Sequence, residues 1–166
     1  MNTNKTRILI IEDHPSFREG IKTVLSVDKR FEIVGEAGTA RDGLEKAKRL
    51  NPDLVTVDLS LPDQSGIDLI SEILDCRSGL PILVISMHSN IGHVIRAIQA
   101  GALGYFLKQS APEDLIKAVE TLRGGEYFFD GSLSVKIAKY LKSPTEVKRE
   151  RCGCNLMSYP AAVAGN

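Results

Sequence analysis

Acidic, hydroxyl and ammonium side chains stand at the ends of four short apolar runs in this 166-residue chain. Glu12 and Asp13 end the first run, Asp58 ends another, and Ser86 and Lys108 end two more. Short apolar runs followed by helical patterns are typical of buried parallel strands, whose carboxyl ends lie at one edge of the sheet. We therefore expect three carboxylates, a hydroxyl and an ammonium to meet in one crevice. That set suits phosphoryl transfer to an aspartate, because it combines a nucleophile, a divalent-metal site and two groups for phosphoryl oxygens.

The carboxylates divide into a nucleophile and a metal site. Asp58 is the expected nucleophile, and its carboxylate would carry the phosphoryl group as an acyl phosphate that water later hydrolyses. Glu12 and Asp13 are expected to hold Mg²⁺, an ion that accepts few protein carboxylates and keeps several waters. We expect Asp13 and Asp58 to bind the ion directly and Glu12 to act through water. The backbone carbonyl of Ser60, two residues after Asp58, could supply another ligand.

Two further side chains are suited to the phosphoryl oxygens. Lys108 is expected to form an ion pair with them, and the Ser86 hydroxyl is expected to donate a hydrogen bond to one of them. In contrast, the three histidines His14, His88 and His93 show no metal-ligand spacing, and we assign them no catalytic role.

Composition and charge narrow the class of protein. Lys plus Arg and Asp plus Glu both number 21, so no global basic field favours nucleic acid. The hydrophobic share of 43% and the charged share of 25% are typical of a globular protein. No apolar stretch approaches the ~18 residues of a membrane span, and the N-terminal residues lack a signal-peptide segment. We therefore expect a cytoplasmic protein with no membrane partner.

Five strand candidates alternate with helical patterns, which predicts a right-handed, doubly wound parallel α/β sheet. The strands are expected at 7–12, 32–37, 53–58, 81–86 and 104–107. Helices are expected from near Pro15, over about 40–50, around 67–74 and 91–98, and from near Pro112. Gly101 is expected to end the fourth helix.

A further helical stretch follows the Gly124–Gly125 pair. It covers about 131–142 and places Leu133, Ile137 and Leu141 on one face. We therefore divide the chain into a main domain at 1–126, a linker helix within 127–142 and an irregular tail at 143–166. The tail contains Cys152 and Cys154, which are too closely spaced for the usual zinc motif and have no second pair.

Four stretches together resemble the response-regulator receiver domains of bacterial two-component signalling. They are Ile11–Pro15, Val57–Gly66, Ile85–Met87 and Gly104–Lys108, and the resemblance covers about residues 5–125. It implies a flavodoxin-like, five-stranded sheet in the order 2-1-3-4-5, and phosphotransfer from a partner histidine kinase to Asp58. It also implies a switch that pairs Ser86 with Tyr105 and remodels the surface of the fourth helix, fifth strand and fifth helix. The module would regulate rather than turn over an external substrate.

Two stretches, His14–Gly20 and Arg123–Phe128, resemble the NarL/FixJ group in particular. In that group a linker helix leads to a LuxR-type helix-turn-helix domain that controls transcription. The roughly twenty residues after the linker are too few for such a DNA reader, so we expect the output domain to be absent or truncated here. We expect no sequence-specific DNA binding by this chain, and a phosphorylation-dependent homodimer is possible. Truncation, a frameshift and a natural single-domain protein all fit the sequence.

Three alternative functions would each require a further sequence feature. An aspartate-nucleophile phosphatase usually carries a second acid two residues after the nucleophile, where this chain has Ser60. A sequence-specific transcription factor would require the output domain. A flavin binder of flavodoxin type would need a Ser/Thr-rich phosphate loop after the first strand, where Glu12 and Asp13 would repel phosphate in the absence of a metal.

Overall fold

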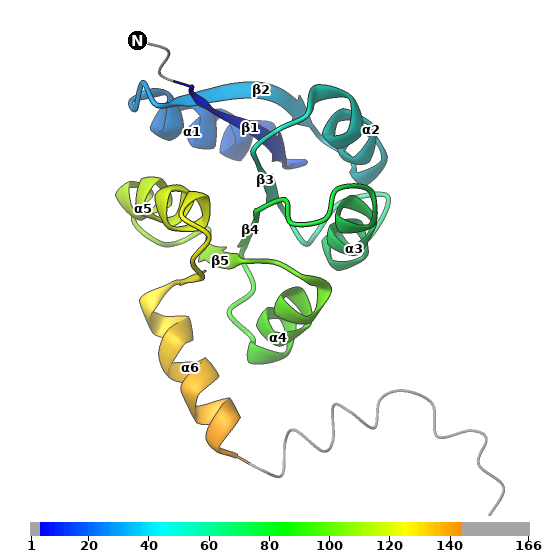
Figure 1. The fold of residues 1–166 in the computed structure, drawn as a ribbon. Helices are drawn as coiled ribbons and strands as arrows, with labels where there is room; N and C mark the ends of the chain where they lie inside the picture. Colours follow the sequence, from blue (N-terminus) through cyan, green and yellow to red (C-terminus); the bar gives the residue numbers. More distant parts are fainter. Residues whose placement is uncertain (1–3, 144–166) are drawn as a thin grey trace, which may run out of the picture.

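A computed structural model describes residues 4–143 and shows a single parallel sheet covered by helices on both faces (Figure 1). The strands of this sheet are β1 (Thr6–Ile11), β2 (Phe31–Ala37), β3 (Leu54–Val57), β4 (Ile82–Ser86), β5 (Gly104–Leu107) and β6 (Phe128–Phe129). The helices are α1 (Pro15–Ser26), α2 (Ala40–Leu50), α3 (Gly66–Cys76), α4 (Ile91–Ala100), α5 (Pro112–Arg123) and α6 (Gly131–Lys142). The doubly wound class predicted from the sequence is therefore confirmed.

The expectation of five strands is wrong, because the sheet has six in the order β2-β1-β3-β4-β5-β6. After α5 the chain turns at Gly125, whose φ of 81° is readily adopted by glycine. It then runs parallel to β5, with Phe129 paired to Tyr105. A strand of two residues is too short to produce an alternating pattern, so hydrophobic periodicity does not predict it.

The sixth strand also changes the start of the last helix. Of the segment 127–142 that was assigned to the linker helix, residues 127–130 are not helical and α6 begins at Gly131. The expected tail from 144 to 166, with Cys152 and Cys154, lies outside the described residues. In the part of the chain that the structure describes, no helix is both long enough and apolar enough to cross a membrane.

Two apolar layers hold the helices against the sheet. On one face α1 and α5 pack side by side, with Ile8 and Ile10 of β1 beneath them (Figure 1). On the other face one apolar layer contains Leu9 and Ile11 of the same strand together with residues of α2, α3 and α4. Alternate residues of β1 thus enter opposite apolar layers. The residues that face each layer are buried, which explains why the sequence from Ile8 to Ile11 is apolar throughout.

Local signals fix where the helices begin and end. Pro15 opens α1, as expected for a residue suited to the first helical turn. The hydroxyl of Thr39 accepts a hydrogen bond from the Asp42 amide at the start of α2, and the Asn90 side chain caps α4 in the same way. The prediction that Gly101 ends α4 is confirmed, since it adopts a φ of 111° at the cap.

Candidate functional site

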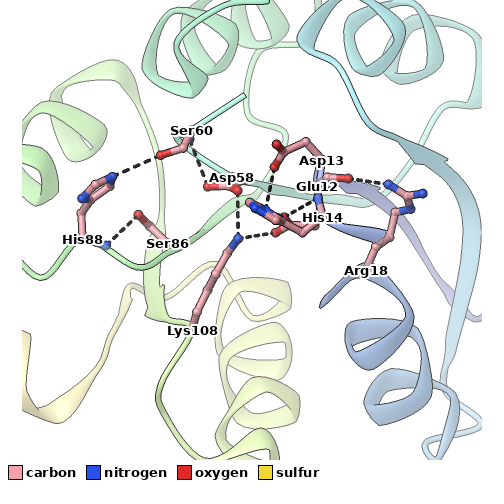
Figure 2. Close-up of polar contacts among 9 residues, drawn as sticks. All are labelled: Glu12, Asp13, His14, Arg18, Asp58, Ser60, Ser86, His88 and Lys108. Atoms are coloured by element: carbon pink, nitrogen blue, oxygen red, sulfur yellow. Dashed lines mark hydrogen bonds and ion pairs between the residues drawn. The ribbon is translucent and has the colours of Figure 1, made fainter. Parts of the chain in front are cut away.

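The chemically reactive residues named from the sequence meet at the carboxyl edge of the sheet (Figure 2). Glu12 and Asp13 follow β1, Asp58 follows β3, Ser86 ends β4 and Lys108 follows β5. The β1 and β3 segments are neighbouring parallel strands, and the Asp58 amide donates to the Ile11 carbonyl at 3.0 Å. This pairing brings the carboxylates that follow the two strands together.

Lys108 is the cation at the centre of the site. Its ammonium nitrogen lies 2.8 Å from Glu12 Oε2 and 2.9 Å from Asp58 Oδ2. The side chains are 6%, 1% and 3% exposed, in the order Lys108, Glu12 and Asp58. Burial lowers the pKa of Lys108, but the two carboxylates outweigh burial and raise its pKa overall, so the ammonium stays charged.

The pKa of Glu12 is raised because its carboxylate is buried close to that of Asp58. Burial raises its pKa above the ordinary value, the Lys108 contact and the His14 amide oppose this, and the nearby Asp58 charge adds to the rise. One ammonium therefore does not fully neutralise the acidic set.

The loop after β3 holds the Asp58 carboxylate in place. The Ser60 amide donates to Asp58 Oδ1 at 3.0 Å, so both carboxylate oxygens have partners. Gly66, the first residue of α3, packs so tightly that an added Cβ would lie 2.2 Å from the Asp58 carbonyl oxygen. Any other residue at this position would displace the backbone of Asp58, which explains the glycine. Ser60 lies beside the carboxylate, and a metal-binding role for its carbonyl stays a prediction.

The structure places Ser86 and Tyr105 next to each other but does not join Ser86 to Asp58 by a hydrogen bond. Ser86 Oγ instead accepts from the His88 amide at 3.1 Å. The Tyr105 hydroxyl donates to the His88 carbonyl at 2.7 Å, and its ring is 1% exposed. Burial raises the pKa of Tyr105. The Tyr105 ring is thus buried, and its hydroxyl is held by the loop after β4.

Two histidines that the sequence left without a role lie at this site. The His88 ring nitrogen Nε2 lies 3.1 Å from Ser60 Oγ, which connects the loops after β3 and β4. His88 also stacks on His93 of α4, with ring centroids 4.8 Å apart. His14 lies beside Glu12 and Asp13 (Figure 2). Spacing in sequence gave no signal for these contacts, since they depend on how the loops are placed.

The donor atoms present fit a divalent cation. One donor atom from each of Glu12, Asp13, His14 and Asp58 lies within 4.8 Å of the others. Glu12 Oε2 and Asp13 Oδ1 are buried and accept no well-aligned hydrogen bond, although Glu12 Oε2 lies 2.8 Å from the Lys108 ammonium and Asp13 Oδ1 lies 3.0 Å from His14 Nδ1. Buried acceptors of this kind require a compensating charge, and carboxylate oxygens suit Mg²⁺.

A parallel sheet with an acidic cluster, a buried lysine and a hydroxyl at its carboxyl edge is the arrangement expected of a phosphoacceptor module. The family model of the response regulator receiver domain matches residues 8–120, and the chain belongs to this family. It is 34% identical over 142 residues to the nitrate/nitrite response regulator protein NarL of Escherichia coli strain K12, covering 86% of this chain and 66% of that protein. It is 30% identical over 151 residues to the transcriptional regulatory protein DegU of Brevibacillus brevis, covering 90% and 64%.

Solved structures agree with this assignment. The isolated receiver domain of RcsB from Salmonella enterica serovar Typhimurium, determined in the presence of the phosphomimetic BeF3⁻, superposes with a TM-score of 0.74 at 30% identity. The match covers 79% of this chain and 97% of that one. A LuxR-family two-component response regulator from an Aurantimonas species gives a TM-score of 0.81 at 29% identity, covering 84% and 100%. The chain is thus a receiver domain of NarL/LuxR type, and it spans 64% and 66% of the length of the DegU and NarL relatives.

Proposed function

We propose that Asp58 accepts a phosphoryl group from the phosphohistidine of a histidine kinase. The observation that carries this proposal is the buried pair of Asp58 and Lys108, 2.9 Å apart at the carboxyl edge of the sheet. A carboxylate held beside a fixed ammonium is oriented for attack, and the ammonium stands where negative charge develops on the phosphoryl oxygens.

The transfer exchanges one bond to phosphorus for another. An Asp58 oxygen forms a bond to phosphorus, the bond from phosphorus to the kinase imidazole breaks, and the imidazole leaves with its electron pair. Asp58 then carries an acyl phosphate, and hydrolysis by water returns the carboxylate and inorganic phosphate. During transfer Lys108 releases its contact with the Asp58 oxygen and pairs with the phosphoryl oxygens, while Ser86 rotates away from the His88 amide to donate to one of them.

Glu12, Asp13 and Asp58, with the Ser60 carbonyl, are the residues that would hold Mg²⁺. The bound ion supplies positive charge that offsets the repulsion between these carboxylates and the incoming phosphoryl group. The fit of the donor set and the buried acceptors on Glu12 and Asp13 support this assignment.

The output is a change at the surface formed by α4, β5 and α5, with Tyr105 as the element that responds to Ser86. A phosphoryl group adds negative charge beside a hydroxyl and a lysine, so it can bias a two-state element. The contacts of His88 support this route, because they join the hydroxyl, the aromatic ring and α4. Phosphorylation would also favour a homodimer, and in the whole protein it would control transcription, as the names of the relatives suggest.

We expect this chain not to hydrolyse external phosphomonoesters. An aspartate phosphatase would place an acid where Ser60 stands, and Ser60 Oγ contacts His88 instead. Release of phosphate from a model phosphomonoester over many turnovers would favour the phosphatase.

Intact mass after incubation with acetyl phosphate and Mg²⁺ tests the proposed acceptor. The wild type should gain one phosphoryl group, and Asp58→Asn should gain none although its side chain is similar in size. Asp68→Asn, in the exposed first turn of α3, is the matched control and should be phosphorylated like the wild type. Equal phosphorylation of Asp58→Asn would overturn the assignment.

A further inference from the structure

His14 lies against the carboxylates proposed to bind the metal, although its sequence position predicts no role for it. Its ring nitrogen Nδ1 is 3.1 Å from Glu12 Oε1 and 3.0 Å from Asp13 Oδ1. The His14 amide also donates to Glu12 Oε1 at 3.0 Å, which fixes the backbone that carries the ring. Figure 2 shows the imidazole between the two acidic side chains and Asp58.

The spacing of these donors matches an octahedral metal shell. Metal–donor bonds of about 2.1 Å place neighbouring donors about 3.0 Å apart and opposite donors about 4.2 Å apart. The Nδ1 atom of His14 is at the neighbouring distance from both carboxylates. The four donors, which include one from Asp58, lie within 4.8 Å of one another, about 0.6 Å more than the opposite distance. Small side-chain rotations would therefore bring His14 Nδ1 to an ion that Asp13 and Asp58 bind directly, with Glu12 acting through water.

We propose that His14 is a nitrogen ligand of the divalent cation in this site. The proposal rests on the proposed function, because the ion is the one held beside Asp58. Imidazole suits borderline transition ions better than Mg²⁺, which prefers oxygen. The site therefore takes ions such as Mn²⁺ and Co²⁺ more tightly than its carboxylates alone would. His14 binds as the neutral tautomer with its proton on Nε2, since Nδ1 must present a lone pair.

The competing explanation is that His14 only donates a hydrogen bond to the carboxylates. The two explanations differ in one measurable respect, which is whether a nitrogen atom bonds the metal. The side chain is 64% exposed, so replacing it should leave the fold intact.

Pulsed electron paramagnetic resonance of Mn²⁺ bound to the full chain tests the ligand directly. The wild type should show nitrogen-14 modulation from a coordinated imidazole, and His14→Asn should lose it while still binding Mn²⁺ through oxygen. His88→Asn is the matched control, because His88 contacts Ser60 rather than the carboxylates, and it should keep the modulation. Modulation that is absent from the wild type or unchanged in His14→Asn would overturn the proposal.

Metal affinities provide an independent measure. By calorimetric titration, His14→Asn should bind Co²⁺ at least about tenfold more weakly than the wild type, since loss of groups that merely orient ligands already costs that much. Its Mg²⁺ affinity should fall by a clearly smaller factor than its Co²⁺ affinity, because Mg²⁺ gains little from nitrogen. Equal losses for both ions would contradict a nitrogen bond.

Phosphorylation of the wild type by acetyl phosphate and Mg²⁺ is measured in parallel. Its absence would contradict the proposed function, whereas phosphorylation without nitrogen modulation contradicts only the role of His14.

Discussion

At the scale of single residues, Lys108 is expected to stabilise the metal-free protein by neutralising two buried carboxylates. Lys108→Met should lower the free energy of unfolding by about 3 kcal/mol, since removal of one partner leaves buried charges uncompensated. Urea unfolding monitored by circular dichroism in metal-free buffer measures the difference.

Lys117→Met is the control for this variant, because Lys117 is 70% exposed and pairs with Asp114 on the surface of α5. Exposed pairs contribute little, so its stability should stay within about 0.5 kcal/mol of the wild type. A second check is addition of Asp58→Asn to Lys108→Met, which should restore part of the lost stability by removing one of the two unpaired charges. Wild-type stability in Lys108→Met would show that the carboxylates do not depend on the ammonium.

The Tyr105 hydroxyl also makes a contribution to stability that can be measured separately. Tyr105→Phe removes the hydrogen bond to the His88 carbonyl and keeps the buried ring, so it should cost about 1 kcal/mol of stability. The control Tyr127→Phe, at a side chain 62% exposed, should have no measurable effect. Chemical unfolding of both variants tests this, and equal effects at the two positions would argue against a specific role for the Tyr105 contact.

At the scale of elements, α6 is packed onto α4 rather than standing free. Leu133 is fully buried in the layer that contains α4, and Lys136 Nζ donates to the Ser89 carbonyl in the loop after β4 at 3.0 Å. Leu133→Ala should therefore cost about 2–4 kcal/mol, the range of a large-to-small core substitution. Val135→Ala on the exposed face of the same helix should cost little. Denaturant titration would reveal an unpacked α6 if the two variants were equally stable.

The contacts of α6 matter for the switch as well as for stability. β6 pairs with β5 at Tyr105, and Lys136 bonds a residue three positions after Ser86. A rearrangement of the loop after β4 would therefore change the contacts that hold α6 in place. We therefore expect the proposed switch to affect the segment that follows the receiver fold.

The loop after β3 is tied to α2 through Asp63, which predicts a pH dependence. Asp63 accepts hydrogen bonds from the amides of Ala40 at 2.8 Å and Arg41 at 3.0 Å, and these bonds lower its pKa below 3.8. A carboxyl group whose pKa is lowered by folding stabilises the fold above its unfolded pKa, and this stabilisation is lost as the pH falls through the folded pKa.

Asp63→Ala should consequently be less stable than the wild type at pH 6, and the two proteins should converge below pH 3.8. The free energy of unfolding of both proteins between pH 6 and pH 2 measures this. A gap that stays constant over the whole range would mean that the charge of Asp63 is not what stabilises α2.

At the scale of the whole molecule, a cation that binds only the folded chain should stabilise it. Mg²⁺ at 100 times its dissociation constant should raise the free energy of unfolding by about 2.7 kcal/mol. Asp13→Asn should weaken this effect at the same Mg²⁺ concentration, because a ligand charge is lost. Thermal unfolding with Mg²⁺ or with NaCl of equal ionic strength separates binding from screening, and an undiminished Mg²⁺ effect in Asp13→Asn would contradict its role.

The alternation of strands and helices could be predicted from the sequence alone, and with it the edge of the sheet at which the reactive residues lie. That inference works because a buried parallel strand must be apolar, so the polar residue that ends the run marks its carboxyl end. Pro15 and Gly101 likewise act through local backbone preferences, and a local signal can be read without the fold.

The tertiary structure decided what depends on packing between distant segments. The pairing of Phe128 and Phe129 with β5 exists only because α5 returns the chain to the sheet edge. The positions of His14 beside Glu12 and of His88 beside Ser60 depend on loop conformations, and no periodicity encodes them. Residues that face each other across strand ends are unrelated in sequence spacing, so their contacts follow from the assembled sheet alone.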